Sequence, residues 1–505
     1  MSDKRVAIIG AGMSGMAAWK ACQEQGIGAV VYEKTDDICG LWRYRDEVVE
    51  GNPSLMRSTT LNTSKEMSAL SDFPVPKHFP NFMHHSVMRQ YLTSYAEKFG
   101  FIENVKLKHE LIHCVPNDDY DSTGRWMLTV RDIEMSRVLT EVFDGVMVCT
   151  GTYQKPIIPE FANQHLFKGQ VLHSTEYREP RDFYGKRVLV VGVGSSGTDI
   201  AVEVSNVCTN VYLSSRSGCW LYKRVGPYGL PLDIFGFRRY LAWMFDGPAY
   251  PLLCWASQLY LNFIFNPKLY GLQSTHKVFS HNNTAVNDDL PKRIITGAVR
   301  VKPDVQEFTE NGVIFSGESR EYECDVVVFG TGYELSYPFL SQDILPINNP
   351  DFRLYKHLFI PNGKHSHTLA LIGIVSSVGP YLPVFELQCR YFAQLMTNKI
   401  QLPSDKEMSK EINCRKEWVK KYYPGYEKYG RQVRHVQYMD ELAECVGCKP
   451  KLMKYLFTDP KLWWHLYFGP CVPYHYRLNG PNCWPEARET ILTVMDRIKA
   501  PFKNA

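Results

Sequence analysis

A glycine fingerprint occurs twice in this sequence and constrains the fold more than any other feature. Its first copy follows the apolar run 5–9 and places Gly10, Gly12 and Gly15 before an alanine-rich segment. In a strand–turn–helix unit the first glycine makes the tight turn, the second admits a pyrophosphate close to the backbone, and the third lets helix and strand pack closely. Glu33 ends the next predicted strand, where a carboxylate accepts hydrogen bonds from an adenosine ribose and repels a 2′-phosphate. Residues 5–33 are therefore predicted to form a dinucleotide-binding βαβ unit.

The second copy reads "KRVLVVGVGSSG" and places Gly192, Gly194 and Gly197 after another apolar strand. Its following strand ends at Ser214, Ser215 and Arg216 instead of at an acid. A guanidinium at this point suits a 2′-phosphate, so the second unit is predicted to prefer NADPH. The alternative is that Arg216 is only a solvated arginine at a strand end.

A further internal repeat indicates how the two units are connected. "DGVMVCTGTY" (144–153) and "DVVVFGTGYE" (325–334) each predict a buried strand followed by Thr-Gly, which marks a crossing between domains. The predicted fold is α/β, with two nested Rossmann-like dinucleotide-binding domains and a mostly helical insertion. The predicted ranges are 1–154 for the first part of an FAD domain, 155–330 for an NADP domain with the insertion 217–290, and 331–505 for the return to the FAD domain and the C-terminal region.

The charge and cysteine content of the sequence argue against some classes of binding partner. The 505 residues include 57 basic and 53 acidic side chains that are well mixed, so nucleic acid is not an expected partner. Most of the 14 cysteines lie in apolar runs. Cys445 and Cys448 form the one close pair, which suits a redox dithiol, half a zinc site, or two inert cysteines at a helix end. Without a second pair or a histidine cluster we expect inert cysteines and no metal. The first strand begins so near Met1 that we expect no signal peptide and a cytoplasmic protein.

A third motif identifies the family that the chain resembles. Phe167, Gly169, His173 and Tyr177 match an F-x-G-x-x-x-H-x-x-x-Y/F signature between the two fingerprints. With "LNTSKEMSALSDFPVP", "NDDLPKRIITGAV", "ELQCR" and "YRLNGPNCWPEAR", the sequence resembles the animal flavin-containing monooxygenases, which are class B flavoprotein monooxygenases, over nearly its whole length. The resemblance implies that NADPH reduces FAD and that dioxygen forms a flavin C4a-hydroperoxide. This species would oxygenate the nitrogen or sulfur of small lipophilic amines or sulfides.

The resemblance also implies which residues contact the cofactors. FAD contacts are implied for Gly10, Ala11, Gly12, Met13, Ser14, Gly15, Glu33, Leu41, Trp42, Leu61 and Thr63. NADP contacts are implied for Gly192, Gly194, Ser196, Gly197, Thr198, Asp199 and Arg216. Asn62 matches the catalytic asparagine beside the flavin and nicotinamide, although a turn-forming asparagine is the alternative. His173 resembles a general base in isolation, but it lies between domains and the chemistry needs no base, so we expect a structural role.

Two positions depart from the family pattern. Cys39 stands where the family has a glycine before Leu-Trp, which argues against a left-handed backbone at that residue. Ser195 stands where asparagine is frequent, so one side-chain contact to NADP is expected to differ while the backbone turn is kept.

The insertion raises the question of membrane contact. Residues 247–267 carry no charge and are long enough to span a bilayer, but Pro251, Gln258 and Asn262 interrupt them. A span would also split a nucleotide domain across the membrane. We expect the insertion to cover the active site and to rest on a membrane surface, here the cytosolic face of the endoplasmic reticulum; an ordinary packed helical cap is the alternative. The chain ends in "ILTVMDRIKAPFKNA", so no C-terminal anchor is expected. A homodimer is one assembly that the sequence leaves open.

Three rival functions share parts of this pattern. A Baeyer–Villiger monooxygenase would use the same fold and cofactors on ketones. A disulfide reductase would need a dithiol at the flavin, where "ICGLW" offers only Cys39. A nucleotide-binding sensor or membrane scaffold without turnover is the non-catalytic alternative, against which the two intact fingerprints and Asn62 count.

Overall fold

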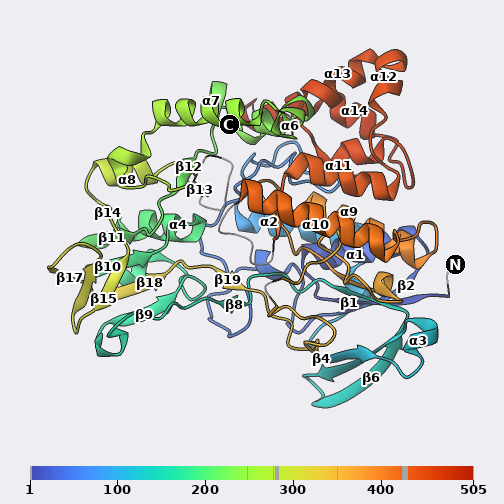
Figure 1. The fold of residues 1–505 in the computed structure, drawn as a ribbon, viewed down its shortest axis with the longest axis horizontal. Helices are drawn as coiled ribbons and strands as arrows, with labels where there is room; N and C mark the ends of the chain where they lie inside the picture. The colour runs from blue at the N-terminus through green and yellow to red at the C-terminus, as the bar shows by residue number, and fades with distance from the viewer. Residues whose placement is uncertain are drawn as a thin grey trace.

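Two parallel sheets form the framework of the molecule (Figure 1). The computed structural model describes residues 3–503 apart from 247, 277, 279–283, 350 and 424–429. The first sheet has the order β20-β7-β1-β2-β3, with β1 (Arg5–Ile9), β2 (Gly28–Tyr32), β3 (Val105–Lys106), β7 (Gly145–Val148) and β20 (Leu369–Leu371). The second has the order β14-β11-β10-β18-β9, with β9 (Gln170–His173), β10 (Arg187–Val191), β11 (Asn210–Ser214), β14 (Arg300–Lys302) and β18 (Val326–Phe329).

Along the sequence, the strands of the second sheet lie between the strands of the first. It completes four strands of the first sheet before residue 150, forms the whole second sheet, and then returns with β20, which pairs with β7. At the two crossings β8 (Lys155–Pro156) pairs antiparallel with β19 (Tyr333–Glu334). The predicted nested α/β architecture is therefore confirmed.

Helices cover both sheets, as the continuous apolar strands require. Val188, Leu189 and Val190 of β10 are fully buried, which is typical of a parallel strand covered on both faces. In the first sheet α1 (Met13–Glu24) packs against β1 and against α9 (Leu382–Met396), whose residues are all buried. Antiparallel strands flank the sheets: β4 (His109–Pro116), β5 (Trp126–Asp132) and β6 (Arg137–Phe143) beside the first, β15 (Val305–Phe308), β16 (Gly312–Phe315) and β17 (Glu321–Glu323) beside the second.

The insertion after β11 is mostly helical, as predicted. It begins with β12 (Trp220–Tyr222), ends with β13 (Thr284–Val286), and contains α5 (Asp233–Gly236), α6 (Arg239–Asp246), α7 (Tyr250–Ile264) and η6 (Pro267–Tyr270). Gly247, the first residue of the uncharged stretch, lies outside the described residues. In the part of the chain that the structure describes, no helix combines the length and the apolar character needed to cross a bilayer.

The C-terminal part adds further helices, of which α11 packs against α9. They are α10 (Asp405–Tyr422), α11 (His435–Val446), α12 (Leu452–Thr458), α13 (Pro460–Phe468), α14 (Ala487–Leu492) and α15 (Val494–Lys503). Cys445 and Cys448 lie on either side of Gly447, which ends α11 in the left-handed conformation. Burial raises the pKa of both thiols, so they are poor nucleophiles at a helix end, as expected.

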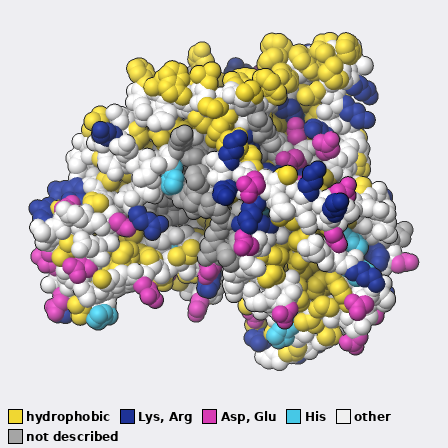
Figure 2. Space-filling model, viewed as in Figure 1, with side chains coloured by type: hydrophobic (Ala, Val, Ile, Leu, Met, Phe, Trp, Pro, Cys, Tyr) yellow, Lys and Arg dark blue, Asp and Glu magenta, His cyan; other side chains and the backbone are white. Residues whose placement is uncertain are grey.

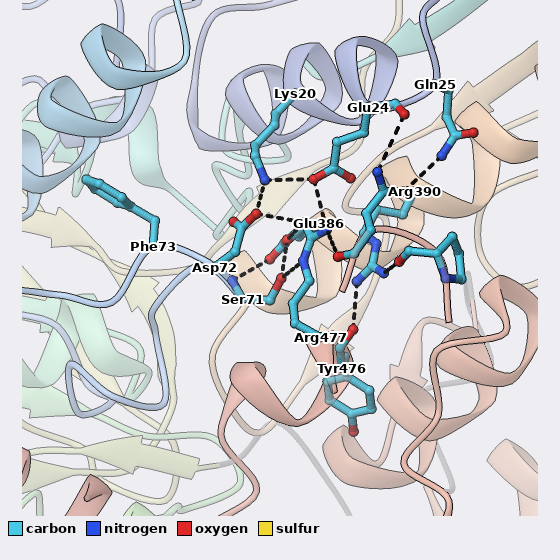
Figure 3. Close-up of polar contacts among 12 residues, drawn as sticks. Lys20, Glu24, Gln25, Ser71, Asp72, Phe73, Glu386, Arg390, Tyr476 and Arg477 are labelled. Atoms are coloured by element: carbon cyan, nitrogen blue, oxygen red, sulfur yellow. Dashed lines mark hydrogen bonds and ion pairs between the residues drawn. The ribbon is translucent and has the colours of Figure 1, made fainter. Parts of the chain in front are cut away.

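A buried ionic network joins α1, α9 and the C-terminal region (Figure 3). Arg477, at the end of η8 (Pro473–Arg477), is only 1% exposed. Its guanidinium lies 2.8 Å from a carboxylate oxygen of Glu386 on α9 and 2.8 Å from one of Glu24 on α1. It also donates to the Ser71 hydroxyl at 2.7 Å. Each partner comes from a different part of the chain, so the network fixes these parts relative to one another.

The network gathers three of the segments that carry the family resemblance. Ser71 comes from "LNTSKEMSALSDFPVP", Glu386 from "ELQCR" and Arg477 from "YRLNGPNCWPEAR". Burial by itself would raise the pKa of Glu386, but the guanidinium of Arg477, helped by Lys20 and Arg390, outweighs it and holds the pKa below the ordinary value. Glu386 therefore remains ionised, and the ion pair is present throughout the physiological pH range.

We expect Arg477→Gln to destabilise the protein by about 3–5 kcal/mol, because it removes the guanidinium that pairs with the buried carboxylate of Glu386 and leaves Glu24 paired with Lys20 alone. The denaturant midpoint measures the loss. Lys168→Gln is the matched control, since it breaks an exposed ion pair with Glu310 and should leave the midpoint unchanged. Equal midpoints for the two variants would contradict a stabilising role for the network.

Candidate functional site

The two glycine fingerprints form cradles of the same construction at the carboxyl edges of the two sheets. We call Gly10, Gly12 and Gly15 the first cradle and Gly192, Gly194 and Gly197 the second. The first glycine of each has a positive φ, 107° and 111°. Its N–H donates to the last residue of the neighbouring strand, Tyr32 O at 2.8 Å in the first cradle and Ser214 O at 3.0 Å in the second.

The third glycine of each cradle lets a helix begin against the turn. A Cβ atom on Gly15 would lie 2.0 Å from Gly10 O, and one on Gly197 would lie 2.0 Å from Gly192 O. No side chain fits at either position. The second glycine behaves differently, because a Cβ on Gly194 meets nothing within 4 Å. The space in front of α4 (Ser195–Val204) is therefore open to a ligand, and no side chain caps the helix N-terminus.

Glu33 is held in the first cradle by three donors. Ala11 N donates to one carboxylate oxygen at 2.7 Å, and Thr35 donates to the other through its N–H at 2.9 Å and its hydroxyl at 2.8 Å. The side chain is buried beside β2. Its remaining lone pairs suit an adenosine ribose, so the predicted position of the acid is compatible with FAD.

Cys39 corrects one expectation. Its φ of 76° is left-handed, although the cysteine argued against that conformation. A residue with a side chain in this conformation costs about 1–2 kcal/mol of folding free energy, and local contacts offset this cost. Cys39 N donates to Ala11 O at 3.0 Å, and Trp42 N donates to Cys39 O at 3.0 Å. The turn brings Gly40 against Gly12, since a Cβ atom added to Gly40 would lie 3.1 Å from Gly12 Cα. The turn and η1 (Gly40–Trp42) are therefore fixed to the first cradle.

Polar atoms around the first cradle fit an FAD molecule. Leu41 and Trp42 lie in η1, and Met13 and Ser14 begin α1. The Ser14 hydroxyl donates to Cys149 O at 3.2 Å. The Trp42 indole N–H and the Thr150 hydroxyl are buried without a hydrogen-bond partner among the described residues. Buried polar groups of native proteins normally have partners, so these two point to a bound molecule that would supply them.

The second cradle presents a similar set of groups. The Thr198 hydroxyl is turned inward and donates to Gly194 O at 3.1 Å, whereas Ser196 is exposed. Asp199 accepts a bond of 2.7 Å from the Asn287 amide, and burial raises the pKa of Asp199 to about 6. Arg216 is exposed just beyond β11, at the same edge of the sheet. Ser195 begins α4, and the backbone turn before it matches the first cradle.

Asn62 is connected towards the second cradle through a residue that the sequence did not reveal. Its side-chain oxygen accepts a bond of 2.7 Å from the guanidinium of Arg224, which comes from the insertion. Arg224 also pairs with Asp288 at 3.4 Å, next to the residue that holds Asp199. Arg224 was not identified from the sequence, because nothing in "WLYKRVGPYG" distinguishes it from a surface arginine. The acidic "NDD" segment, which contains its partner Asp288, was the one available signal.

The neighbours of Asn62 are held by backbone and hydroxyl contacts. Leu61 is buried, and its N–H donates to Met83 O at 2.9 Å. The Thr63 hydroxyl lies 2.7 Å from that of Ser68. Hydrogen bonds of the described residues thus connect Asn62 towards the second cradle, while no such bond joins it directly to the glycines of the first.

The signature residues between the fingerprints have structural positions. The Phe167 ring packs edge-on against Phe308 in the core beside the second sheet. A Cβ on Gly169 would lie 2.6 Å from Asp325 O, so only glycine allows this approach. The Tyr177 hydroxyl donates to Glu203 on α4 at 2.8 Å.

His173 uses both ring nitrogens in backbone contacts. Thr175 N donates to Nδ1 at 3.2 Å, and Nε2 therefore carries the proton that is donated to Gly332 O at 3.1 Å. The residue is fully buried, and burial lowers its pKa. The neutral ring fastens the end of β9 to the residues after β18 and has no nitrogen left to act as a base.

We expect Gly194→Ala to retain the melting temperature of the native protein but to lose affinity for NADP+ by at least tenfold. The reason is that the added methyl group meets no protein atom and projects into the space in front of α4. Gly197→Ala should instead lower the melting temperature, since its methyl group collides with Gly192 O. Isothermal titration with NADP+ and thermal unfolding measure the two effects, and unchanged NADP+ affinity in Gly194→Ala would show that the ligand lies elsewhere.

Comparisons with known proteins agree with this geometry. A family model described as flavin-binding monooxygenase-like matches residues 3–505. Rat flavin-containing monooxygenase 5 is 41% identical over 504 residues, covering 99% of this chain and 94% of the relative. In fold, the chain is similar to S-allyl-L-cysteine S-oxygenase of Allium sativum, with a TM-score of 0.65, 21% identity and 99% of both chains covered. It is also similar to cyclohexanone monooxygenase, with a TM-score of 0.64, 14% identity, and 88% of this chain and 98% of that chain covered.

These matches confirm the resemblance drawn from the sequence, and with it the assignment of FAD and NADPH as cofactors. The two cradles, the acid at the first and the open helix terminus at the second are what such cofactors require. The chain belongs to the flavin-binding monooxygenase family and is an NADPH-dependent flavin monooxygenase.

Proposed function

We propose that this monooxygenase oxygenates soft nitrogen or sulfur atoms of small lipophilic amines or sulfides. The observation that carries the proposal is the position of Asn62, whose amide is held by Arg224 on the side of the second cradle. An uncharged amide that is fixed in this way suits a reaction that needs fixed hydrogen bonds and no general base.

We propose that residues 1–154 and 331–505 bind FAD and that residues 155–330 bind NADPH. The first cradle, Glu33, Trp42 and the residues beside Asn62 would hold FAD, whereas the second cradle, Thr198, Asp199 and Arg216 would hold NADPH. Bound FAD supplies the activation of dioxygen after reduction by NADPH. The chain's own residues bind the pyrophosphates, orient the two cofactors and exclude water.

Asn62 has one defined duty in this scheme. Since Arg224 donates to its Oδ1, the two N–H bonds of the amide remain available to a cofactor or an oxygen atom. An amide does not titrate, so it offers these donors without releasing a proton. Arg224 acts through Asn62 as a positioning residue, and its pairing with Asp288 limits the directions in which the guanidinium can turn.

We expect Asn62→Asp to leave the reduction of FAD by NADPH within about twofold of the native rate but to divert most of the consumed oxygen to hydrogen peroxide. An aspartate would pair with Arg224 and would offer no N–H donor. The measurement is the ratio of oxygenated product to peroxide per NADPH consumed. Asn117→Ser, which alters an amide in the loop between β4 and β5, is the control. An unchanged ratio in Asn62→Asp would refute the proposed role.

The Baeyer–Villiger reaction on ketones is the second candidate. It has the same cofactors, and cyclohexanone monooxygenase, whose name specifies a ketone, shares the fold. The garlic enzyme, whose name specifies sulfur oxygenation, shares it equally. Product analysis with a dialkyl sulfide and a cyclic ketone under identical conditions separates the two reactions: sulfoxide formation supports our proposal, and exclusive formation of the ester overturns it.

An exposed apolar face suggests where the protein meets a lipid surface. Figure 2 shows hydrophobic side chains gathered along the top of the molecule, over α7 and over α12 and α13. We call this the apolar face; the large exposed apolar side chains of α7, α12 and α13 are Leu252, Trp255, Leu259, Tyr260, Phe263, Ile264, Met453, Phe457 and Trp464. Phe263 is 91% exposed and Leu252 is 63% exposed. Monomeric soluble proteins rarely expose a contiguous apolar patch of this extent.

We propose that the apolar face rests on the cytosolic surface of the endoplasmic reticulum membrane. Exposed lysines, namely Lys268, Lys451, Lys454 and Lys461, accompany the aromatic side chains, and such cations bind anionic headgroups. Aromatic rings with basic neighbours are typical of interfacial binding. Sequence reasoning placed this contact in 217–290 alone; α12 and α13 extend the proposed surface.

Replacing Phe263 and Leu252 together by serine should reduce binding to vesicles that contain phosphatidylserine by at least tenfold, because each buried apolar side chain contributes roughly 1.5–3 kcal/mol. Vesicle flotation measures the bound fraction. Met135→Ser is the control, because Met135 is 68% exposed in the turn before β6, at the opposite end of the molecule in Figure 1. If native protein and double variant float equally, the apolar face is not the contact.

A further inference from the structure

Glu203 on α4 receives hydrogen bonds from two other parts of the chain. The Tyr177 hydroxyl of the signature segment donates to its Oε2 at 2.8 Å. The Ser58 hydroxyl, from the segment that leads to Asn62, donates to its Oε1. We call these three residues the Glu203 bridge. One carboxylate thus joins the helix of the second cradle, the connection between the sheets, and the approach to the catalytic asparagine.

The carboxylate is kept in an unfavourable electrostatic environment. Among the described residues no lysine or arginine forms an ion pair with Glu203, and the charges of Asp199 and Glu179 act on it with the same sign. Burial raises the pKa of Glu203 to about 6, with a further contribution from these two carboxylates and against the hydrogen bond from Tyr177. Glu203 is half-buried, so the hydroxyls of Tyr177 and Ser58 are the groups that satisfy a carboxylate without a counter-charge.

Backbone contacts beside the bridge make the same connection. Arg57 N donates to Arg178 O at 2.9 Å, and the Ser54 hydroxyl donates to Thr175 O at 2.9 Å. The buried guanidinium of Arg178 donates in turn to Arg45 O at 2.7 Å and to Glu47 O at 2.9 Å. The segment 45–58 is therefore fastened along its length to 175–178.

The bridge connects two elements that carry predicted site residues. Along α4 it shares one rigid helix with Gly194 and Thr198 of the second cradle. Along the other chain segment, Ser58 precedes Asn62 by four residues, and the intervening backbone is held by bonds from Thr59 N to Met56 O and from Leu61 N to Met83 O. The hydrogen bond from Ser58 to Glu203 therefore acts on the short segment that carries Asn62.

We propose that Glu203 is a positioning residue whose bonds to Ser58 and Tyr177 fix Asn62 relative to the second dinucleotide cradle. The inference deepens the proposed function and rests on it for the consequence in catalysis. It assigns a purpose to Tyr177 of the signature and to Glu203, which no motif identified. Neither residue touches a reacting atom; both act through Asn62 and α4.

Hydrogen exchange followed by mass spectrometry tests the bridge without any turnover. In Glu203→Ala, peptides that cover 54–62 and 175–178 should both exchange about tenfold faster, the factor that corresponds to one lost hydrogen bond to a charged group. Ser58→Ala should have the same effect on 54–62. Glu203→Gln should restore most of the protection, because an amide can accept from one hydroxyl and donate to the other. Ser205→Ala, which removes a bond within the same helix end, is the control.

The ratio of oxygenated product to hydrogen peroxide per NADPH consumed gives the catalytic readout. In Glu203→Ala and Ser58→Ala this ratio should fall about tenfold, while the rate of FAD reduction and the dissociation constant for NADP+ change less than about twofold. A purely stabilising role would lower the melting temperature alone. The proposal is overturned if exchange in both segments matches that of Ser205→Ala, or if the product-to-peroxide ratios do. If the native protein is not reduced by NADPH, the proposed function fails, and the exchange data still decide whether the bridge exists.

Discussion

The architecture depends on two places where a helix begins in contact with the turn before it. Gly15 and Gly197 allow α1 and α4 to start where any Cβ atom would lie 2.0 Å from a carbonyl oxygen. Because the helices begin so close to the sheets, their unpaired N–H groups face the carboxyl edges of β1 and β10. Both cofactor sites, the turn at Cys39 and the bridge on α4 derive their positions from these two contacts.

Long-range polar contacts then hold the nested parts together. The network around Arg477 ties α1 of the first cradle to α9 and to the C-terminal region, and it is buried, so its charges must remain paired. The Glu203 bridge makes a comparable connection between α4 and the segment before Asn62. In both cases a residue that matches the family pattern, Tyr177 in the bridge and Glu386 in the network, holds segments in place.

Sequence reasoning performed unevenly across the candidate site. The glycines and Glu33 were predictable because a tight turn and a ribose contact demand particular residue types at particular spacings. Arg224 was not, since its contact with Asn62 spans the insertion and depends on how that insertion folds back. Cys39 was predicted wrongly: the local preference against a positive φ yielded to contacts with Ala11 and Gly12 that only the folded turn provides.

The sequence by itself determined the two βαβ units, their order along the chain and the nature of the cofactors, because these follow from local spacing and from the chemistry of phosphate and ribose binding. Only the tertiary structure decided that His173 has no free nitrogen, that Asn62 is oriented by an arginine of the insertion, and that α12 and α13 extend the apolar face. Each of these depends on residues far apart in the chain, whose proximity is a property of packing and leaves no periodic or spaced signal in the sequence.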